Sequence, residues 1–253
     1  MLNYVEYGKE NKYDDDIFFQ KYSQMSRSQQ GLAGAGEWET LRKLLPDFKD
    51  KRVLDLGCGY GWHCIYAMEH GASSVVGVDI SHKMLEVAKE KTHFPQVEYK
   101  CCAIEDVEFP EESFDVILSS LAFHYVADYE ILVKKIYRIL KSGGKLVFTV
   151  EHPVFTAYGT QDWYYNEKGE ILHFPVDNYY YEGKRTAVFL GEKVTKFHRT
   201  LTTYLNTLLS NGFIINHIVE PQPPEYMMDI PGMQDEMRRP MMLIVSANKK
   251  MDR

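Results

Sequence analysis

Short apolar runs and amphipathic helical patterns alternate along the chain from about residue 37 to residue 151. Strands are predicted where these apolar runs are short and bounded by turn residues, at 53–56, 74–79, 97–101, 114–119 and 145–151. The clearest helix lies between the last two strands, where Asp128 can cap an apolar stripe of helical period and Gly143-Gly144 is predicted to end it. Strands that alternate with helices in this way predict a parallel sheet with right-handed crossovers.

The alternation stops between residues 152 and 196, a segment rich in Tyr, Pro and Gly with little helical periodicity. We expect this segment to form an inserted cap, with a hairpin around Asn166-Glu167-Lys168-Gly169. A helical pattern then returns and ends at Asn211-Gly212, and two strands follow at 213–219 and 241–246. Because a loop and not a helix joins these two strands, the last strand is expected to be antiparallel.

Length, composition and charge narrow the class of protein. A chain of 253 residues, 45% apolar and 26% charged, is long enough for one large α/β core with residues left for a cap. The net charge of −7 disfavours a nucleic acid backbone as partner. No apolar run approaches the roughly 18 residues of a membrane span. Residues 1–7 lack the basic start and apolar block of a signal peptide, so we expect a cytoplasmic protein.

Cysteine usage gives no sign of a metal site. The spacings of Cys58, Cys64, Cys101 and Cys102 match no zinc pattern, and two adjacent cysteines in a strand would point to opposite faces. We therefore expect reduced thiols and no bound metal.

The strongest chemical signal is a glycine-rich turn, Asp55-Leu56-Gly57-Cys58-Gly59-Tyr60-Gly61, directly after the first predicted strand. Glycines at every second position let the backbone approach a ligand closely. Asp79 comes 22 residues after Gly57, at the end of the second strand, where a carboxylate can accept hydrogen bonds from both hydroxyls of a ribose. The pattern predicts a nucleoside site, and its alternative is an ordinary tight turn between strand and helix.

The spacing of the turn excludes two other nucleotide sites. A dinucleotide site carries G-x-G-x-x-G, whereas here the third glycine comes one residue early and Trp62 stands in the place of the last. A P-loop is excluded because no Lys followed by Ser or Thr comes after the glycines.

The pattern D-x-G-x-G-x-G, together with Asp79, the seven strands and the final hairpin, resembles the class I S-adenosylmethionine-dependent methyltransferases. The similarity is greatest to the bacterial small-molecule type with a methyltransferase type 11 domain. It implies an α/β fold with a doubly wound, Rossmann-like, seven-stranded sheet whose last strand is antiparallel. It also implies a cofactor-binding core at 37–151 that is completed by 197–253, an N-terminal arm or lid at 1–36 and the inserted cap at 152–196. The cofactor is expected to be S-adenosyl-L-methionine, with S-adenosyl-L-homocysteine as product.

The resemblance further implies a set of cofactor-binding residues. Asp55 would orient the glycine turn or reach the methionine amino group through water, and Asp79 would hold the ribose hydroxyls. Gly57, Cys58 and Gly59 would pass beneath the methionine and the ribose. The remaining implied contacts are Ile80, Met84, Ala103, Ile104 and Glu105 around the adenine, and a carbonyl of Ser119 toward the methionine amino group.

The arm adds two candidates. Tyr22 is expected to cover the sulfonium through a cation–π contact, and Arg27 to pair with the methionine carboxylate. The alternative is an arm whose aromatic side chains pack against the flank of the sheet.

Two positions refine the resemblance. Many relatives carry Asp at the position of Ala103 to accept from the adenine amino group, so Glu105 or Asp106 is expected to take that role here. Ser119-Ser120-Leu121-Ala122 stands where enzymes that methylate amino groups of nucleobases or glutamine carry Asn/Asp-Pro-Pro-Tyr/Phe. The chain is therefore not expected to belong to that class.

Two histidines are candidate catalytic residues. Methyl transfer from a sulfonium needs alignment and exclusion of water, and a general base assists where the acceptor must lose a proton. His124 follows the fourth strand at the edge of the expected methyl site, and its alternative role is in packing or helix capping. His152, in Glu151-His152-Pro153, follows the fifth strand, and its alternative is a turn residue held by Pro153.

The leading hypothesis is a cytoplasmic enzyme that methylates a small molecule at oxygen, nitrogen or carbon by in-line displacement. One alternative is methylation of a tRNA or rRNA base, and another is a regulatory protein that binds the cofactor without catalysis. The expected partner is the small-molecule acceptor, with neither nucleic acid nor membrane, and the chain is expected to be a monomer or a homodimer.

Overall fold

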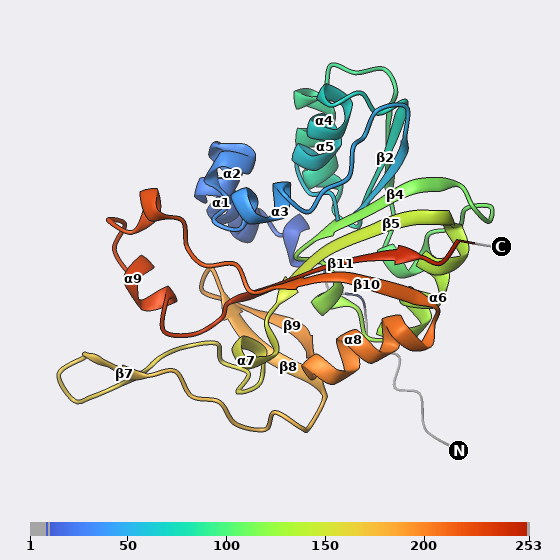
Figure 1. The fold of residues 1–253 in the computed structure, drawn as a ribbon. Coiled ribbons are helices and arrows are strands. Elements are labelled where there is room, and N and C mark those ends of the chain that lie inside the picture. The colour runs from blue at the N-terminus through green and yellow to red at the C-terminus, as the bar shows by residue number, and fades with distance from the viewer. Residues whose placement is uncertain (1–8, 10, 252–253) are drawn as a thin grey trace.

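The computed structural model describes residue 9 and residues 11–251, and these contain one seven-stranded sheet and two short two-stranded sheets (Figure 1). Residues 1–7, in which no leader was expected, and the start of the predicted arm lie outside the described residues. The large sheet has the strand order β10-β11-β5-β4-β1-β2-β3. Its strands are β1 (Arg52–Leu56), β2 (Ser74–Asp79), β3 (Val97–Cys101), β4 (Phe114–Ser120), β5 (Leu140–Glu151), β10 (Phe213–Val219) and β11 (Met242–Lys249).

The direction of the strands confirms the predicted fold class. The pairs β1–β2, β1–β4, β2–β3 and β4–β5 are parallel, and β11 is antiparallel to both of its neighbours, β10 and β5. Parallel strands need crossovers, which the helices between them supply, whereas the antiparallel β11 returns directly beside β10. The carboxyl ends of β1, β2, β4 and β5 therefore meet at one edge of the sheet.

Helices cover both faces of the sheet (Figure 1). One face carries α3 (Trp38–Arg42), α4 (Trp62–Glu69) and α5 (His82–Lys91), and the other carries α6 (Tyr129–Ile139) and α8 (Leu201–Ser210). Successive residues of β1 face opposite sides: Val53 packs in the core with Trp38, and Leu54 packs in the core with Leu132. A strand buried on both faces reads as a continuous apolar run, which is why the sequence revealed these strands clearly.

The end of α6 differs from the prediction. The helix begins at its predicted cap, where the Asp128 carboxylate accepts from the Ile131 amide at 2.9 Å, but it ends at Ile139. Leu140 already has extended backbone angles and pairs with Phe114 of β4. Gly143-Gly144 lies within an irregular stretch of β5, because the register then jumps to Val116 opposite Lys145. The glycines thus bend a strand and do not stop the helix.

The segment 152–196 contains a short helix and two hairpins. After α7 (Pro153–Thr156), β6 (Tyr164–Tyr165) and β7 (Ile171–His173) pair antiparallel around the predicted turn at Asn166–Gly169. A second hairpin, of β8 (Gly183–Phe189) and β9 (Glu192–His198), was not predicted. Its turn, Leu190-Gly191, has φ values of 54° and 79°, a geometry that matches the twist of a two-residue hairpin.

The N-terminal segment folds into short helices, and the first two of them pack on this second hairpin. They are η1 (Lys12–Asp14), α1 (Asp16–Ser23), α2 (Ser26–Gln29) and η2 (Gly31–Gly34). Phe18 of α1 is fully buried against Ala187 and Val194, and its ring centroid lies 5.8 Å from that of Phe189. The segment between β10 and β11, which carries η5 (Glu225–Met227) and α9 (Met233–Glu236), reaches the cap through Arg239, whose guanidinium lies 4.5 Å from the centroid of Phe155. Three peripheral segments therefore gather near the carboxyl edge of the sheet (Figure 1).

Candidate active site

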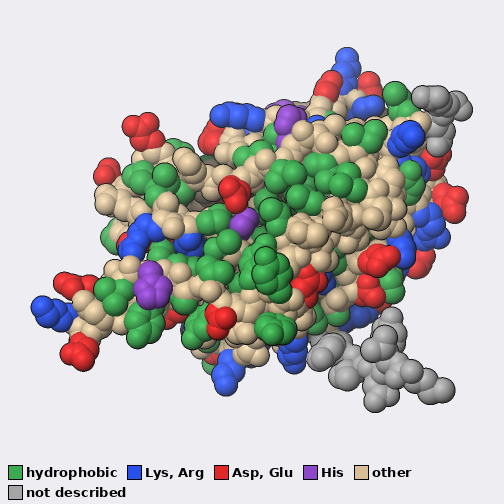
Figure 2. Space-filling model, turned by 60° about the horizontal axis from the view of Figure 1, so that its bottom comes forward, with side chains coloured by type: hydrophobic (Ala, Val, Ile, Leu, Met, Phe, Trp, Pro, Cys, Tyr) green, Lys and Arg blue, Asp and Glu red, His purple; other side chains and the backbone are tan. Residues whose placement is uncertain are grey.

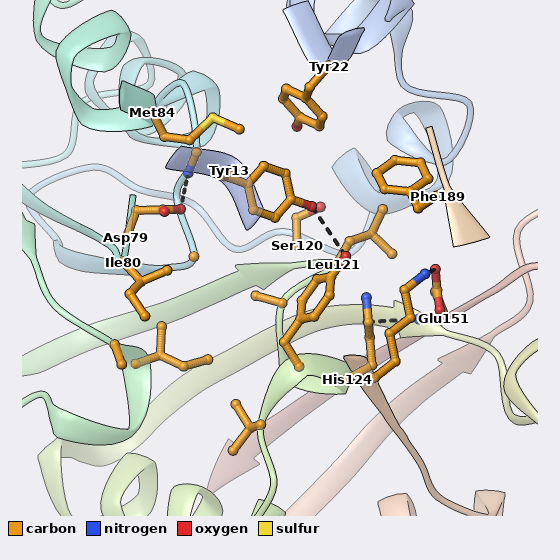
Figure 3. A pocket seen from close by; sticks show the side chains of 18 of the residues that line it. Tyr13, Tyr22, Asp79, Ile80, Met84, Ser120, Leu121, His124, Glu151 and Phe189 are labelled. Atoms are coloured by element: carbon orange, nitrogen blue, oxygen red, sulfur yellow. Dashed lines mark hydrogen bonds and ion pairs between the residues drawn. The ribbon is translucent and has the colours of Figure 1, made fainter. Parts of the chain in front are cut away.

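A cavity of about 220 Å³ lies at the carboxyl ends of the parallel strands, far larger than the roughly 10–15 Å³ that one water needs (Figure 3). Ligands of open α/β sheets bind at this edge. The sheet, the N-terminal helices and the β8–β9 hairpin all contribute to its wall. The lining residues that the sequence predicted are Tyr22, Arg27, Gly57, Gly59, Asp79, Ile80, Met84, Ala103, Ile104, Glu105 and His124.

The glycine turn and Asp79 form one hydrogen-bonded unit at this edge. The amides of Gly57 and Cys58 donate to the carbonyl of Val78 at 2.8 and 2.9 Å, which ties the turn to the end of β2. The Asp79 carboxylate accepts from the amide of Gly59 through one oxygen and from that of Ser81 through the other, both at 2.9 Å. Burial raises the pKa of Asp79 against the effect of these amides. The two amides therefore orient the carboxylate, but their hydrogen bonds do not fully offset the cost of burying its negative charge.

Three glycines of the turn have left-handed backbone conformations. Gly57, Gly59 and Gly61 have φ values of 78°, 52° and 75°. A Cβ on Gly57 would stand 2.4 Å from the Cβ of Ala122, whereas a Cβ on Gly59 would meet nothing within 4 Å. The open space beside Gly59 forms a cradle next to the Asp79 carboxylate, an arrangement suited to a ribose.

The adenine end of the predicted site also lines the cavity. Met84 and Ile80 follow β2 beside Asp79 (Figure 3), and Ala103 and Ile104 are buried in the wall after β3. Glu105 lines the cavity, and burial raises its pKa. Asp106 is not among the lining residues and pairs with Lys9. Of the two proposed substitutes for a carboxylate at position 103, only Glu105 faces the cavity.

Four predicted residues lie outside the cavity wall. Cys58 lines a smaller hollow that shares Gly57, Gly59 and Arg27 with the cavity. The hydroxyl of Ser119 donates to the carbonyl of Leu56 at 2.7 Å, and the next residue, Ser120, lines the cavity in its place. Asp55 is buried beneath the turn, with the thiol of Cys64 at 3.5 Å from one oxygen.

His152 is the fourth of these residues. Its Nδ1 accepts from the amide of Val154 at 3.1 Å and so caps α7, and its Nε2 lies 2.9 Å from a carboxylate oxygen of Glu220. This is the role in a turn before Pro153 that the sequence left open as the alternative to catalysis.

The buried carboxyl of Asp55 makes a prediction about stability. Burial raises the pKa of Asp55 to about 7. In the unfolded chain Asp55 loses its proton at about pH 4, whereas in the folded protein it keeps the proton up to about pH 7. Between these pH values the folded state binds more protons than the unfolded state, so the contribution of Asp55 to stability falls as pH rises. Asp55→Asn removes this loss. We expect the ligand-free variant to gain up to about 4 kcal/mol over the native chain between pH 4 and pH 8, at roughly 1.4 kcal/mol per pH unit of the window.

Urea unfolding of both chains at several pH values measures this difference. If the free energies of unfolding of the native chain and the variant change with pH in parallel, Asp55 has no raised pKa in the folded protein and the prediction is wrong.

Of the two arm residues, Tyr22 lines the cavity and Arg27 already has a partner. The guanidinium of Arg27 donates to Glu37 Oε1 at 2.5 Å, and Glu37 is buried. Arg27 lines both the cavity and the smaller hollow beside the glycine turn. An incoming carboxylate would therefore meet an ion pair there and not a lone cation.

His124 lines the cavity, but its hydrogen bonding differs from that of a free base. Its Nδ1 accepts from the amide of Glu151 at 3.4 Å, so Nε2 carries the ring hydrogen. Burial lowers the pKa of His124 to about 4, which keeps the ring neutral. In this tautomer His124 offers a hydrogen-bond donor to the cavity and has no free lone pair for a proton.

Several lining residues were missed by the sequence reasoning. They are Tyr13, Tyr125, Glu151, Phe189, Lys196, Met241 and Met242. Glu151 ends a predicted strand at the ligand-binding edge, a position that could have identified it. Tyr13, Phe189 and Lys196 come from the arm and the cap, which carry no motif, so no sequence signal pointed to them.

A doubly wound sheet whose glycine turn and ribose-type carboxylate border one large cavity defines an enzyme fold that uses a nucleoside cofactor. Comparison with known proteins specifies the family. The sequence model described as "Methyltransferase domain" matches residues 54–148. A solved structure of an S-adenosylmethionine dependent methyltransferase from Listeria monocytogenes is 58% identical over 87% of this chain and 99% of that chain, with a TM-score of 0.83.

Two further relatives agree. A structure of such a methyltransferase from Mesorhizobium loti is 41% identical over 86% of this chain and 100% of that chain, with a TM-score of 0.80. The ubiquinone biosynthesis O-methyltransferase of Coxiella burnetii is 36% identical over 112 residues, which are 44% of this chain and 47% of that protein. The chain belongs to the S-adenosylmethionine-dependent methyltransferases. It is an enzyme, and its cofactor is S-adenosylmethionine, for which Asp79 and the cradle beside Gly59 are suited.

Proposed function

We propose that the protein transfers the methyl group of S-adenosylmethionine to a small molecule, at oxygen, nitrogen or carbon. The observation that carries the proposal is that one cavity joins the nucleoside end, at Asp79, to a second polar end at Glu151 and Lys196. Residues of the arm and the cap line this cavity together with those of the sheet edge. An acceptor bound at the second end is shielded from water, as an in-line displacement requires.

In this proposal the cofactor supplies an electrophilic methyl group on a sulfonium, and the chain supplies alignment. Asp79 holds the ribose hydroxyls, and Ile80, Met84 and Ile104 pack around the adenine. The arm at 1–36 and the cap at 152–196 act as covers, and Tyr13, Tyr22 and Phe189 are their described aromatic side chains in the cavity wall. Exclusion of water then follows from closing these covers over the bound molecules.

The surface supports a small acceptor over a nucleic acid. The net charge is −7, and on the face seen in Figure 2 Lys and Arg side chains are interspersed with Asp and Glu. A long phosphate backbone would favour a continuous basic surface. The residues described include no helix with the length and apolar character needed to cross a membrane.

A labelling experiment separates the two acceptor classes. The purified protein is incubated with S-adenosylmethionine carrying a tritiated methyl group and a cell extract, before and after treatment of the extract with ribonuclease. We expect label in the low-molecular-weight fraction, unchanged by ribonuclease. Label in macromolecular RNA that ribonuclease removes would instead support methylation of a tRNA or rRNA base.

A further inference from the structure

Three polar side chains from different parts of the chain form a closed group, and two of them, Glu151 and Lys196, line the cavity. Lys196 Nζ donates to Glu151 Oε1 at 2.5 Å and to Gln161 Oε1 at 2.8 Å, and Gln161 Nε2 donates to Glu151 Oε2 at 2.5 Å. Glu151 ends β5, Gln161 lies before β6, and Lys196 belongs to β9. The group therefore forms only when the cap is docked on the sheet.

This group lies buried, with the side chains of Lys196 and Glu151 only 4% and 13% exposed. Burying two charges loses more hydration than an apolar pair of similar size would, so a buried pair is weak evidence for a role in stability. Both side chains also line the cavity, and Figure 3 shows Glu151 at the end away from Asp79. A binding role accounts for a charged pair at this place better than packing does.

His124 lies beside this group and adds a hydrogen-bond donor to the acceptor end of the cavity. Figure 3 shows its ring next to Glu151, with the Glu151 amide bonded to Nδ1. The Nε2 hydrogen is then a donor, while the Glu151 carboxylate has lone pairs beyond the two used by Lys196 and Gln161. The acceptor end thus combines one neutral donor with one carboxylate whose charge Lys196 balances.

A hydroxyl matches these groups better than an amine does. Its oxygen has two lone pairs, so one can accept from His124 while the other attacks the methyl carbon, and its hydrogen can be donated to Glu151. An amine nitrogen has a single lone pair, which a hydrogen bond from His124 would occupy at the moment it must attack. The Glu151–Lys196 ion pair has no net charge, so it would not attract an acceptor that carries a free carboxylate or ammonium group.

Resting on the proposed function, we infer that the acceptor is an uncharged hydroxyl compound, whose oxygen is held by His124 and whose proton is taken by Glu151. Phe189, Met241 and Met242 form the apolar wall beside His124 and Glu151. The hydroxyl group is therefore expected to belong to a molecule whose remaining part is apolar or aromatic. Glu151 is then a catalytic residue that the sequence did not identify.

The reaction balances without a further reagent. The hydroxyl oxygen forms a bond to the methyl carbon, the carbon–sulfur bond breaks, and sulfur keeps the bonding pair as the thioether product. The hydroxyl proton passes to the Glu151 carboxylate and from there to water after release. Although burial opposes the charge of Glu151, the Lys196 ammonium and the Gln161 amide that contact its carboxylate hold its pKa below the usual range. A weak base suffices, because an oxygen that gains a methyl group becomes strongly acidic before it loses its proton.

The first test identifies the atom that is methylated. The full chain is incubated with trideuteromethyl S-adenosylmethionine and a metabolite extract, and with catechol, benzyl alcohol, aniline and benzylamine as single probes, and products are read by mass spectrometry. Deuterated methyl ethers support the inference. N-methyl or C-methyl products overturn it while the proposed function stands. Label found only in RNA, or in no small molecule, overturns both.

The second test uses variants on the hydroxyl compound that is turned over best. Glu151→Gln keeps the size and the hydrogen bond to Lys196 but cannot take a proton, so kcat is expected to fall on the order of 100-fold. KM and the calorimetric Kd for S-adenosylhomocysteine should stay within about threefold of the native values. Lys196→Met should also lower kcat, and Lys193→Met, on the same strand but exposed, is the matched control.

A merely structural role would give a different pattern. Glu151→Gln would then lower the melting temperature and raise KM with kcat retained, and that result overturns the inference. Since Lys196→Met leaves a buried carboxylate without its cation and can fail to fold, the conclusion depends on Glu151→Gln.

Discussion

Asp79→Ala is expected to weaken the binding of S-adenosylhomocysteine by roughly 100-fold or more, about 3 kcal/mol, measured by calorimetry. Each hydrogen bond to a charged group contributes about 1.5–3 kcal/mol, and the Asp79 carboxylate can accept from two ribose hydroxyls. The amides of Gly59 and Ser81 orient this carboxylate now, and both lose their partner in the variant.

Two controls show whether this loss is specific. Glu86→Ala removes an exposed carboxylate from the neighbouring α5 and should leave the affinity unchanged. Thermal unfolding of Asp79→Ala in the absence of ligand shows whether the variant keeps its fold despite the two amides that lose their partner. An affinity within about threefold of the native value would remove Asp79 from the cofactor site.

Gly57→Ala is expected to lower the free energy of unfolding by about 2–5 kcal/mol. The added Cβ would lie 2.4 Å from that of Ala122, and the backbone has a φ of 78°. Overpacking costs about 1–3 kcal/mol, and an alanine in the left-handed region about 1–2 kcal/mol. For a chain of this length, the melting temperature should fall by roughly 4–20 °C.

Two other variants separate the causes of this loss. Gly59→Ala has a φ of 52° but nothing within 4 Å of its Cβ, so it should cost only the backbone contribution. Adding Ala122→Gly to Gly57→Ala removes the methyl that clashes and should recover part of the lost stability, as a double-mutant cycle measures. If Gly57→Ala and Gly59→Ala lower the free energy of unfolding equally, the contact with Ala122 does not contribute to the effect.

The central sheet and the cofactor residues were accessible to sequence reasoning because each rests on a local pattern. Buried parallel strands read as apolar runs, and a left-handed turn such as Gly57 to Gly61 demands glycine at the positions themselves. Where the reasoning was wrong, a distant pairing decided the outcome. Gly143-Gly144 appeared to end a helix, but pairing of Leu140 with Phe114 had already ended it.

The acceptor end was not accessible in the same way. His124 was identified from its place after β4, yet its tautomer depends on the Glu151 amide, which comes from another strand. Lys196 gives no signal in the sequence, because a lysine in a cap without motifs is typical of an exposed surface. Its burial follows from the packing of the β8–β9 hairpin against the arm and the sheet.

The sequence by itself determined the fold class, the cofactor and the edge of the sheet where it binds, because strand periodicity, glycine spacing and Asp79 are encoded within short stretches of chain. Only the tertiary structure decided which side chains face the acceptor. The contacts of Glu151 with Gln161 and Lys196 join residues 10 and 45 positions apart, and that of Tyr13 with Tyr125 joins residues 112 positions apart. Contacts of this kind depend on how the cap and the arm dock, and no local pattern specifies that docking.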